Sequence, residues 1–340
     1  MVTRKKRIVN LRDIAQHTGL SLGLVSQVLN DRPGVSDASR KVVNQAIEQL
    51  GYVPNPLGKV FNRKKSGIAG VVLPIPHLDL FPKMVAGMSM VADEKKLPLL
   101  VSYTTDSASL ESRTLKIFSF LNVNGIILAA VPGESNLQLI RHIMENETLV
   151  VQVERRIAGL AGDYVGSDHL SAGYDATRLL LDKGHQAIGW VAAAQDYAVI
   201  RERYEGYCRA LGEAGLKPEP GWQATVQTGI GSRMIGRIIE EVLRVPGRPR
   251  AFLWNLGEEE FLTQALRELG WQNGKDCDIV LFDADRSTPF EGQSFINFHQ
   301  DAFRIGREAM ELLIQRQNNP LLPGALPTDL CLPYSRTNLS

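Results

Sequence analysis

From Gly67 onward, short apolar runs alternate with segments of helical periodicity, and this alternation constrains the fold more than any other feature of the chain. Each run has the length of a buried strand. The runs span residues 68–73, 97–103, 125–130, 149–153, 188–191, 251–254 and 279–282. Alternation of this kind predicts parallel α/β sheets in two subdomains, with a ligand cleft beyond the carboxyl ends of the strands.

The first 66 residues differ from the rest in charge. They hold 12 Lys and Arg against 4 Asp and Glu, whereas the remaining residues hold 26 against 33, so a net charge of only +1 hides a strong asymmetry. A basic terminal segment indicates a polyanionic partner, although a solvated tail is the alternative when charge alone is considered.

Three short amphipathic helices are predicted within this basic segment. The first carries Leu11, Ile14 and Ala15 on one face and ends at Thr18-Gly19. Ser21 caps the second, whose buried side consists of Leu24, Val25, Val28 and Leu29. The third lies between Ser36 and Gly51, and its apolar stripe consists of Val42, Val43, Ala46, Ile47 and Leu50. Two helices about a three-residue turn have helix-turn-helix spacing, and a purely structural helical hairpin is the alternative.

A longer pattern distinguishes these alternatives. It consists of Asp13-Ile14-Ala15, Gly19-Leu20-Ser21, Val25-Ser26, Val28-Leu29-Asn30, Val35-Ser36, Arg40 and Gly51-Tyr52-Val53-Pro54-Asn55. Residues 9–57 thereby resemble the DNA-binding headpiece of the lactose/galactose repressor (LacI/GalR) family. The resemblance implies an all-α three-helix headpiece whose second helix enters the major groove of double-stranded operator DNA.

The resemblance assigns base contacts to Leu22, Gly23 and Gln27. Leu22 can offer only apolar contact, as with a thymine methyl group, whereas Gln27 can hydrogen-bond adenine. The family more often has arginine where Gln27 stands, so we expect an atypical base preference. Gly23 either allows close approach to the DNA backbone or is a neutral surface substitution. The expected phosphate contacts are Arg12, Ser21, Ser26, Asn30 and Arg40.

Residues 58–66 resemble the hinge helix of the family, which orders on the operator and wedges an apolar side chain into the minor groove. Phe61 occupies the position that leucine usually holds, and Gly58-Lys59 replaces the usual Ala-Arg. The glycine is expected to weaken this helix in the absence of DNA. Asn55, Lys59 and Phe61 complete the expected DNA contacts.

The resemblance extends through the large region, to a fold like that of periplasmic sugar-binding proteins. The matching positions are Phe81 with Gly87, 124–127, Gly184-His185, Arg203 with Gly206-Tyr207, and 326–328. The expected effector-binding residues are Phe81, Asp168, Arg203, Asn255 and Asp283. For Arg203 a surface salt bridge is the alternative role. For Asp168, Asn255 and Asp283 the alternative is capping of a strand or helix.

The effector itself stays open, because the sequence departs from the family at Ile75, His169, Leu256 and Ala284. Carboxylates or amides are usual at these positions, so acceptors for sugar hydroxyls are fewer here. The expected effector is a sugar or sugar derivative, and a less polar ligand, a phosphorylated one held by Arg203, and no small ligand at all remain alternatives.

The expected domains are the headpiece at 1–57, the hinge at 58–66, and an effector-binding and dimerisation domain at 67–340. Within the last, one subdomain is expected at 67–168 plus 299–327 and the other at 169–298 plus 328–340. Operators of this family are near-palindromic, so a homodimer is expected, with an interface that includes the helix around 84–92. The sequence shows no apolar heptads of the kind that form tetramers in some members of the family.

Other classes of protein fit less well. Cys208, Cys277 and Cys331 form no CxxC pair, so neither a metal site nor a cofactor is expected. Gly229 and Gly231 lack the third glycine of a dinucleotide fingerprint, and no phosphate-binding or nucleophile-elbow motif argues for an enzyme. A secreted solute-binding protein is disfavoured because no signal-peptide pattern is present, and a cytoplasmic location is expected. The predicted function is a transcriptional repressor, with induction and corepression equally compatible.

Overall fold

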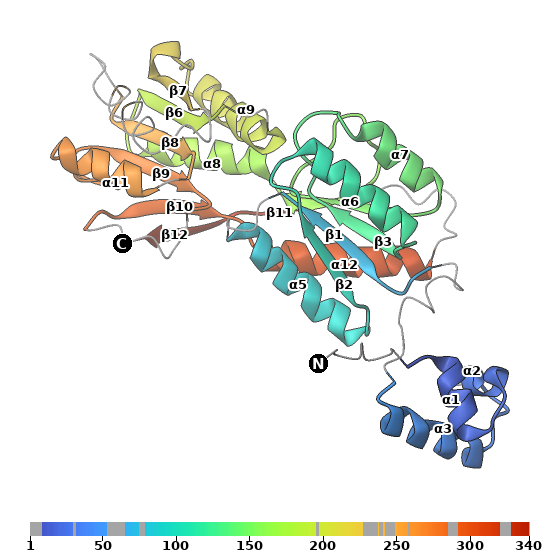
Figure 1. Cartoon of the computed structure of the whole chain (residues 1–340). Coiled ribbons are helices and arrows are strands. Elements are labelled where there is room, and N and C mark those ends of the chain that lie inside the picture. The colour runs from blue at the N-terminus through green and yellow to red at the C-terminus, as the bar shows by residue number, and fades with distance from the viewer. Residues whose placement is uncertain are drawn as a thin grey trace, which may run out of the picture. The chain divides into compact units, whose positions relative to one another are not determined.

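The structure is a computed structural model that describes residues 9–29, 32–52, 65–74, 79–194, 197–226, 237, 241, 249–257, 259–284, 292–319 and 328–339. The chain divides into two compact units, residues 1–66 and 67–340, which are described separately (Figure 1). Within the described residues, no helix is long and apolar enough to cross a membrane.

The described residues of the small unit form the helices α1 (Leu11–Thr18), α2 (Leu22–Leu29) and α3 (Asp37–Leu50). Local side-chain contacts fix where each begins. Asn10 and Asp13 form a reciprocal capping box on α1, the Leu24 amide donates to the Ser21 hydroxyl at 3.2 Å, and Ser36 caps α3. Gly19 and Gly51 end α1 and α3 with positive φ, as the sequence predicted.

The core of the small unit consists of Ile14, Val25, Val28, Val43 and Ala46. Val42 was expected on the same stripe, and this expectation is wrong because its side chain is 42% exposed. Consecutive helical residues point about 100° apart. Since α3 turns Val43 toward the core, Val42 faces solvent.

The first half of the large unit is a parallel six-stranded sheet in the order β11-β5-β4-β3-β1-β2. Its strands are β1 (Ala69–Leu73), β2 (Leu99–Tyr103), β3 (Gly125–Leu128), β4 (Leu149–Val153), β5 (Asp163–Ser167) and β11 (Asp329–Leu332). Helices α5 (Leu80–Glu94) and α12 (Ala302–Asn318) cover one face. Helices α6 (Ala108–Phe120) and α7 (Leu137–Glu145) cover the other (Figure 1).

The second half is a six-stranded sheet in the order β12-β10-β9-β8-β6-β7, in which only β12 is antiparallel to its neighbour among the described strands. Its strands are β6 (Ile188–Ala193), β7 (Gln223–Val226), β8 (Ala251–Asn255), β9 (Asp278–Phe282), β10 (Phe295–His299) and β12 (Ser335–Leu339). The short η1 (Pro220–Trp222) precedes β7. Helices α8 (His169–Asp182) and α9 (Ala198–Glu213) pack on one face, and α11 (Glu259–Glu268) packs on the other.

The chain passes between the two halves at three places: after β5 at Asp168, after β10 at Gln300-Asp301, and after β11 at Pro333-Tyr334. The third crossing corrects the expected boundary, which assigned 328–340 to the second subdomain. Strand β11 instead pairs with β5 in the first sheet, because the register Asp329 to Tyr164 extends that sheet by one parallel strand. Of residues 328–340, only strand β12 belongs to the second sheet.

Helices α8 and α9 approach so closely that glycines form their contact. A Cβ at Gly206 of α9 would collide with the Leu170 carbonyl and would lie 2.6 Å from the Tyr174 amide nitrogen. A Cβ at Gly212, on the same helix, would have no neighbouring atom within 4 Å. The two glycines therefore have different roles, one in packing and one on an open surface.

We predict that Gly206→Ala lowers the free energy of unfolding by about 1–3 kcal/mol through overpacking. Gly212→Ala, the matched control, should raise it by up to about 1 kcal/mol because alanine favours the helix. Urea unfolding followed by circular dichroism measures both. Equal changes in the two variants would show that the helix contact is not as close as described.

Candidate DNA-binding surface and effector cleft

Helix α2 exposes the side chains that the sequence assigned to base reading. Val25 and Val28 point into the core of the small unit, whereas Leu22, Gly23 and Gln27 lie on the exposed side. Leu22 is 43% exposed although it is a large apolar residue. Leu22, Gly23 and Gln27 therefore share the solvent-facing side of α2.

The expected phosphate contacts are divided among several environments. Arg12 is exposed on α1, and Ser21 is exposed while it caps α2. Ser26 and Arg40 are partly buried, and Arg40 donates to the Arg32 carbonyl at 2.8 Å. Asn30, Asn55, Lys59 and Phe61 lie outside the described residues, as does the whole of 58–64.

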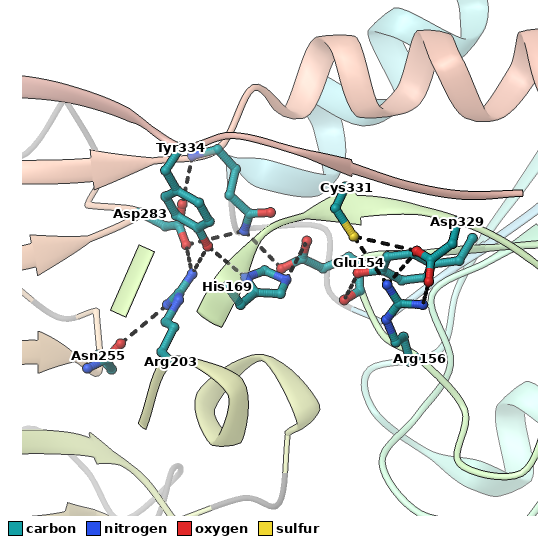
Figure 2. Close-up of polar contacts among 11 residues, drawn as sticks. Glu154, Arg156, His169, Arg203, Asn255, Asp283, Asp329, Cys331 and Tyr334 are labelled. Atoms are coloured by element: carbon teal, nitrogen blue, oxygen red, sulfur yellow. Dashed lines mark hydrogen bonds and ion pairs between the residues drawn. The ribbon is translucent and has the colours of Figure 1, made fainter. Parts of the chain in front are cut away.

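In the large unit, three of the five expected effector-binding residues come together around Arg203 (Figure 2). Arg203 extends from α9 and is 5% exposed, which excludes a surface salt bridge. Its guanidinium donates to the Asp283 carboxylate, to the Asn255 side-chain oxygen at 3.4 Å and to the Tyr334 hydroxyl. The Phe282 ring lies 4.6 Å from the guanidinium carbon, so the planar cation is also stacked.

The cluster lies at the carboxyl ends of strands. Asn255 ends β8 and Asp283 follows β9, as expected for a site in an open parallel sheet. Asp283 has φ of +53°, and Glu154, which follows β4, has φ of +60°. Such backbone conformations are unfavourable for residues other than glycine and concentrate at functional sites.

The other two expected residues lie elsewhere. Phe81 is buried in the core of the first half, and its ring centre is 5.9 Å from the Arg155 guanidinium carbon. Asp168 accepts from the Ser171 amide at 2.9 Å and so caps α8, which is the alternative role that its position in the sequence allowed. Neither residue contacts Arg203 through a hydrogen bond among those described.

A second polar group extends the cluster across the crossings between the halves. Tyr334 and His169 share a hydrogen bond of 2.9 Å between the hydroxyl and Nδ1. His169 Nε2 lies 3.8 Å from Glu154 Oε2, and neither atom has a hydrogen-bond partner. Gln300 donates to Glu154 Oε1 at 2.8 Å and to Asp283 at 3.3 Å. All three chain crossings therefore contribute a side chain to one buried network.

Burial sets the protonation states of Glu154 and His169. Desolvation, reinforced by the charge of Asp283, raises the pKa of Glu154 to about 7. Desolvation and then the charge of Arg203 lower the pKa of His169 well below its ordinary value. The imidazole is therefore neutral near pH 7, and Glu154 changes charge in that range.

Glu154, His169, Gln300 and Tyr334 were not among the sequence-assigned site residues, although His169 was noted as a departure from the family. Glu154 and Gln300 each stand near the carboxyl end of a strand, the rule that identified Asp283, so the same rule could have found them. No local signal marks Tyr334, because its partners are more than 100 residues away in the sequence.

A cavity opens near this cluster, at the ends of β3 and β4 and at the beginning of α9. Its volume is about 150 Å³. Its lining includes Arg155, Arg156, Tyr197 and Arg201, together with residues 130–134. Among the described residues, no group of three or more His, Cys, Asp or Glu side chains could hold a metal ion.

An exposed helix-turn-helix joined to a two-sheet domain with a polar cleft defines a DNA-binding protein with a ligand-binding module. Residues 10–55 match the family described as bacterial regulatory proteins, lacI family. Residues 66–250 match the periplasmic binding proteins and sugar binding domain of the LacI family, and 177–330 match a periplasmic binding protein-like domain. The chain belongs to the LacI family.

Individual relatives are similar along nearly their whole length. The chain is 24% identical over 311 residues to the HTH-type transcriptional repressor PurR of Aliivibrio salmonicida, covering 91% of this chain and 92% of that protein. It is 26% identical over 318 residues to the ribose operon repressor of Escherichia coli, covering 93% and 95%. The Lac repressor dimer bound to operator and an anti-inducer superposes with a TM-score of 0.78 at 21% identity, covering 97% and 98%, which confirms the fold.

We predict that Glu154→Gln becomes more stable relative to the parent protein as pH rises from 5 to 8. At pH 5 the parent carboxyl is protonated in the folded state and resembles the amide. The pKa of Glu154 is higher in the folded than in the unfolded state, so protonation of its carboxyl stabilises the folded parent at low pH. The parent loses this contribution as pH rises through about 7. Urea unfolding at the two pH values measures the change.

The matched control is Glu260→Gln, which changes an exposed carboxyl on α11. Its stability relative to the parent should change less between the two pH values than that of the Glu154 variant, because the side chain is exposed. An equal pH response of the Glu154 and Glu260 variants would contradict the raised pKa.

Proposed function

We propose that this protein is a transcription regulator, a repressor, that binds near-palindromic double-stranded operator DNA as a homodimer and responds to a small-molecule effector. The observation that carries the proposal is the exposed face of α2, with Leu22, Gly23 and Gln27 in solvent above a packed core. The repressor names of the relatives and the operator-bound Lac repressor dimer support it.

In the proposed mechanism, α2 enters the major groove. Leu22 contacts a thymine methyl group, and Gln27 hydrogen-bonds adenine. Arg12, Ser21, Ser26, Asn30 and Arg40 contact phosphates and hold the register without reading sequence. Asn55, Lys59 and Phe61 act at the hinge, where Phe61 wedges into the minor groove and kinks the operator. The headpiece is proposed to span 1–57 and the hinge 58–66.

The homodimer is proposed to form through the first half of the large unit. Met90 of α5 and Phe303 of α12 are both 41% exposed, and the two helices are in contact where Gly87 meets the Phe303 backbone. Exposed apolar side chains on adjacent helices are typical of a subunit interface. A twofold arrangement of this face presents two headpieces to two half-sites.

The cleft between the halves is proposed to bind the effector, with Phe81, Asp168, Arg203, Asn255 and Asp283 as the family positions. A ligand that changes the angle between the halves changes the spacing of the two hinges and thereby operator affinity. The solved complex of CelR with cellobiose, which has a TM-score of 0.67 at 23% identity and covers 97% of this chain and 98% of that one, supports a sugar-related effector.

Family members are regulators, and we propose that this chain likewise has no catalytic activity and needs no cofactor. It would act in the bacterial cytoplasm, on the nucleoid, where operator DNA is found. Polar residues in the cleft would then serve recognition and conformational change, not chemistry.

Operator binding by the purified full-length chain tests the proposal. Affinity for a selected site should fall by on the order of 10³ between about 50 and 200 mM salt, because phosphate contacts release counterions. A chain that begins at Gly67 is the control and should bind no DNA. Binding that is absent in the full chain, or unchanged in the truncated one, would overturn the proposal.

We further predict that Gln27→Ala flattens base preference at one position of each half-site. Discrimination at that position should drop by about 1–3 kcal/mol, because the bidentate contact to adenine is lost. Selection from randomised half-sites measures the preference. Gln45→Ala, which changes an exposed glutamine on α3, should leave it unaltered. If Gln27→Ala also leaves it unaltered, Gln27 does not read the base.

A further inference from the structure

The carboxyl group of Glu154 is buried where the chain passes between the two halves of the large unit. Glu154 follows β4 and is 4% exposed (Figure 2). Its Oε1 accepts from the Gln300 side chain at 2.8 Å, whereas Oε2 has no hydrogen-bond partner among the described residues. A buried carboxylate oxygen without a donor costs free energy, and a proton bound there removes the charge that causes the cost. The protonation state of Glu154 therefore affects the energy of this part of the fold.

The side chain that faces Glu154 Oε2 is the imidazole of His169, the first residue of α8. Its Nε2 lies 3.8 Å from Oε2 and, like that atom, has no hydrogen-bond partner in the described part of the chain. On the other side of the ring, Nδ1 lies 2.9 Å from the Tyr334 hydroxyl. That hydroxyl accepts from Arg203, so its own proton is available to Nδ1. A neutral imidazole that accepts at Nδ1 carries its hydrogen at Nε2, on the side of Glu154.

The two protonation states of Glu154 interact differently with that hydrogen. An ionised carboxylate attracts it and would shorten the 3.8 Å separation toward a charge-assisted hydrogen bond. A protonated carboxyl lacks the negative charge, so the attraction is much weaker. Glu154 belongs to the first half, after β4, whereas His169 begins α8 in the second half. Ionisation of Glu154 would therefore draw the two halves together at the first crossing.

Three charged side chains act on Glu154 from different elements. Burial, and then the negative charge of Asp283 after β9, raises the pKa of Glu154 to about 7. The positive charges of Arg203 on α9 and of Arg155, the next residue in the chain, oppose this rise. Because these effects leave the pKa near neutrality, a small change in the geometry of the cluster changes the fraction of molecules in which Glu154 is charged.

Two buried phenols complete the surroundings of Glu154. Tyr164 of β5 donates to the Glu154 carbonyl oxygen at 3.2 Å, and Tyr334 lies beyond the His169 ring. Burial raises the pKa of both hydroxyls, so both are neutral near pH 7. Neither phenol therefore supplies a charge that could compensate for a change at Glu154.

Contacts at all three chain crossings lead to Glu154. His169 stands directly after the first crossing, and Tyr334 at the third crossing contacts the opposite side of its ring. Gln300, at the second crossing, donates to both Glu154 and Asp283. A change in the angle between the halves would therefore change the affinity of Glu154 for a proton. Such coupling is reciprocal, so the binding of a proton changes the preferred angle.

We propose that Glu154 and His169 form a proton-controlled switch, in which ionisation of Glu154 attracts His169, changes the angle between the halves and makes operator affinity depend on pH. This inference goes beyond the proposed function but rests on it, because operator binding is the output of the switch. The signal is the proton itself, which acts independently of any molecule bound in the cleft.

Operator affinity of the full-length protein, measured near pH 6 and near pH 8 at constant salt, tests the switch. We expect the parent affinity to change by about tenfold, which corresponds to a difference of about one unit in the pKa of Glu154 between the free and operator-bound forms. Glu154→Gln cannot ionise, so most of this change should disappear. The matched control, Glu260→Gln on the exposed side of α11, should retain it. Equal pH dependence of the parent and Glu154→Gln would overturn the proposal.

Calorimetry of operator binding gives a second test, which does not depend on how well the Glu154 variant folds. Titration in two buffers of different ionisation enthalpy measures the protons that are taken up or released near pH 7. The small unit has a titratable group of its own, His17, so the titration is repeated with His17→Gln. We expect proton exchange in both proteins. Its absence in His17→Gln would contradict the switch, whereas operator binding in the same titration would show that the proposed function holds.

Discussion

The buried guanidinium of Arg203 is the interaction on which the large unit depends most. A charge removed from water is tolerated only where partners from the surrounding structure meet it. Here the partners come from the ends of β8 and β9 and from the last crossing between the halves, through Asn255, Asp283 and Tyr334. Asn255 and Asp283 stand at the ends of strands of the second sheet and Tyr334 directly precedes its strand β12, so the buried cation fixes the last crossing against the second half.

The same hydrogen-bond network joins the chain crossings between the halves to Glu154, whose charge changes near pH 7. Tyr334 leads to His169 at the first crossing, and Gln300 at the second links Asp283 to Glu154. Glu154 Oε2 and His169 Nε2 face each other across 3.8 Å without a hydrogen-bond partner. Because these contacts join residues of both halves, a change in the angle between the halves would alter them.

Much of the small unit could be predicted from sequence because its determinants are local. Ser21, Ser36, Gly19 and Gly51 each act on residues within one or two turns, and caps of that kind are visible in any single sequence. The expected strands with long apolar runs were also found. Val42 was misplaced because an apolar residue next to a helical stripe looks the same in the sequence whether it faces the core or solvent.

The features that could not be predicted depend on contacts between residues far apart in the sequence. Strands β5, β7, β10, β11 and β12 lack long apolar runs, and β11 and β12 divide a stretch that the sequence assigned to one subdomain. Of the cleft, Arg203, Asn255 and Asp283 were anticipated, whereas Tyr334 was not. Tyr334 contacts Arg203 and His169 only because the fold places the last crossing beside α8 and α9. No local sequence pattern predicts that placement.

Genomic footprinting of the full-length protein in its own cells tests most directly whether the chain is an operator-binding dimer. We expect discrete near-palindromic sites, each protected over two half-sites, that disappear when residues 1–66 are removed. Protection without twofold symmetry, or sites that persist without the small unit, would contradict this role.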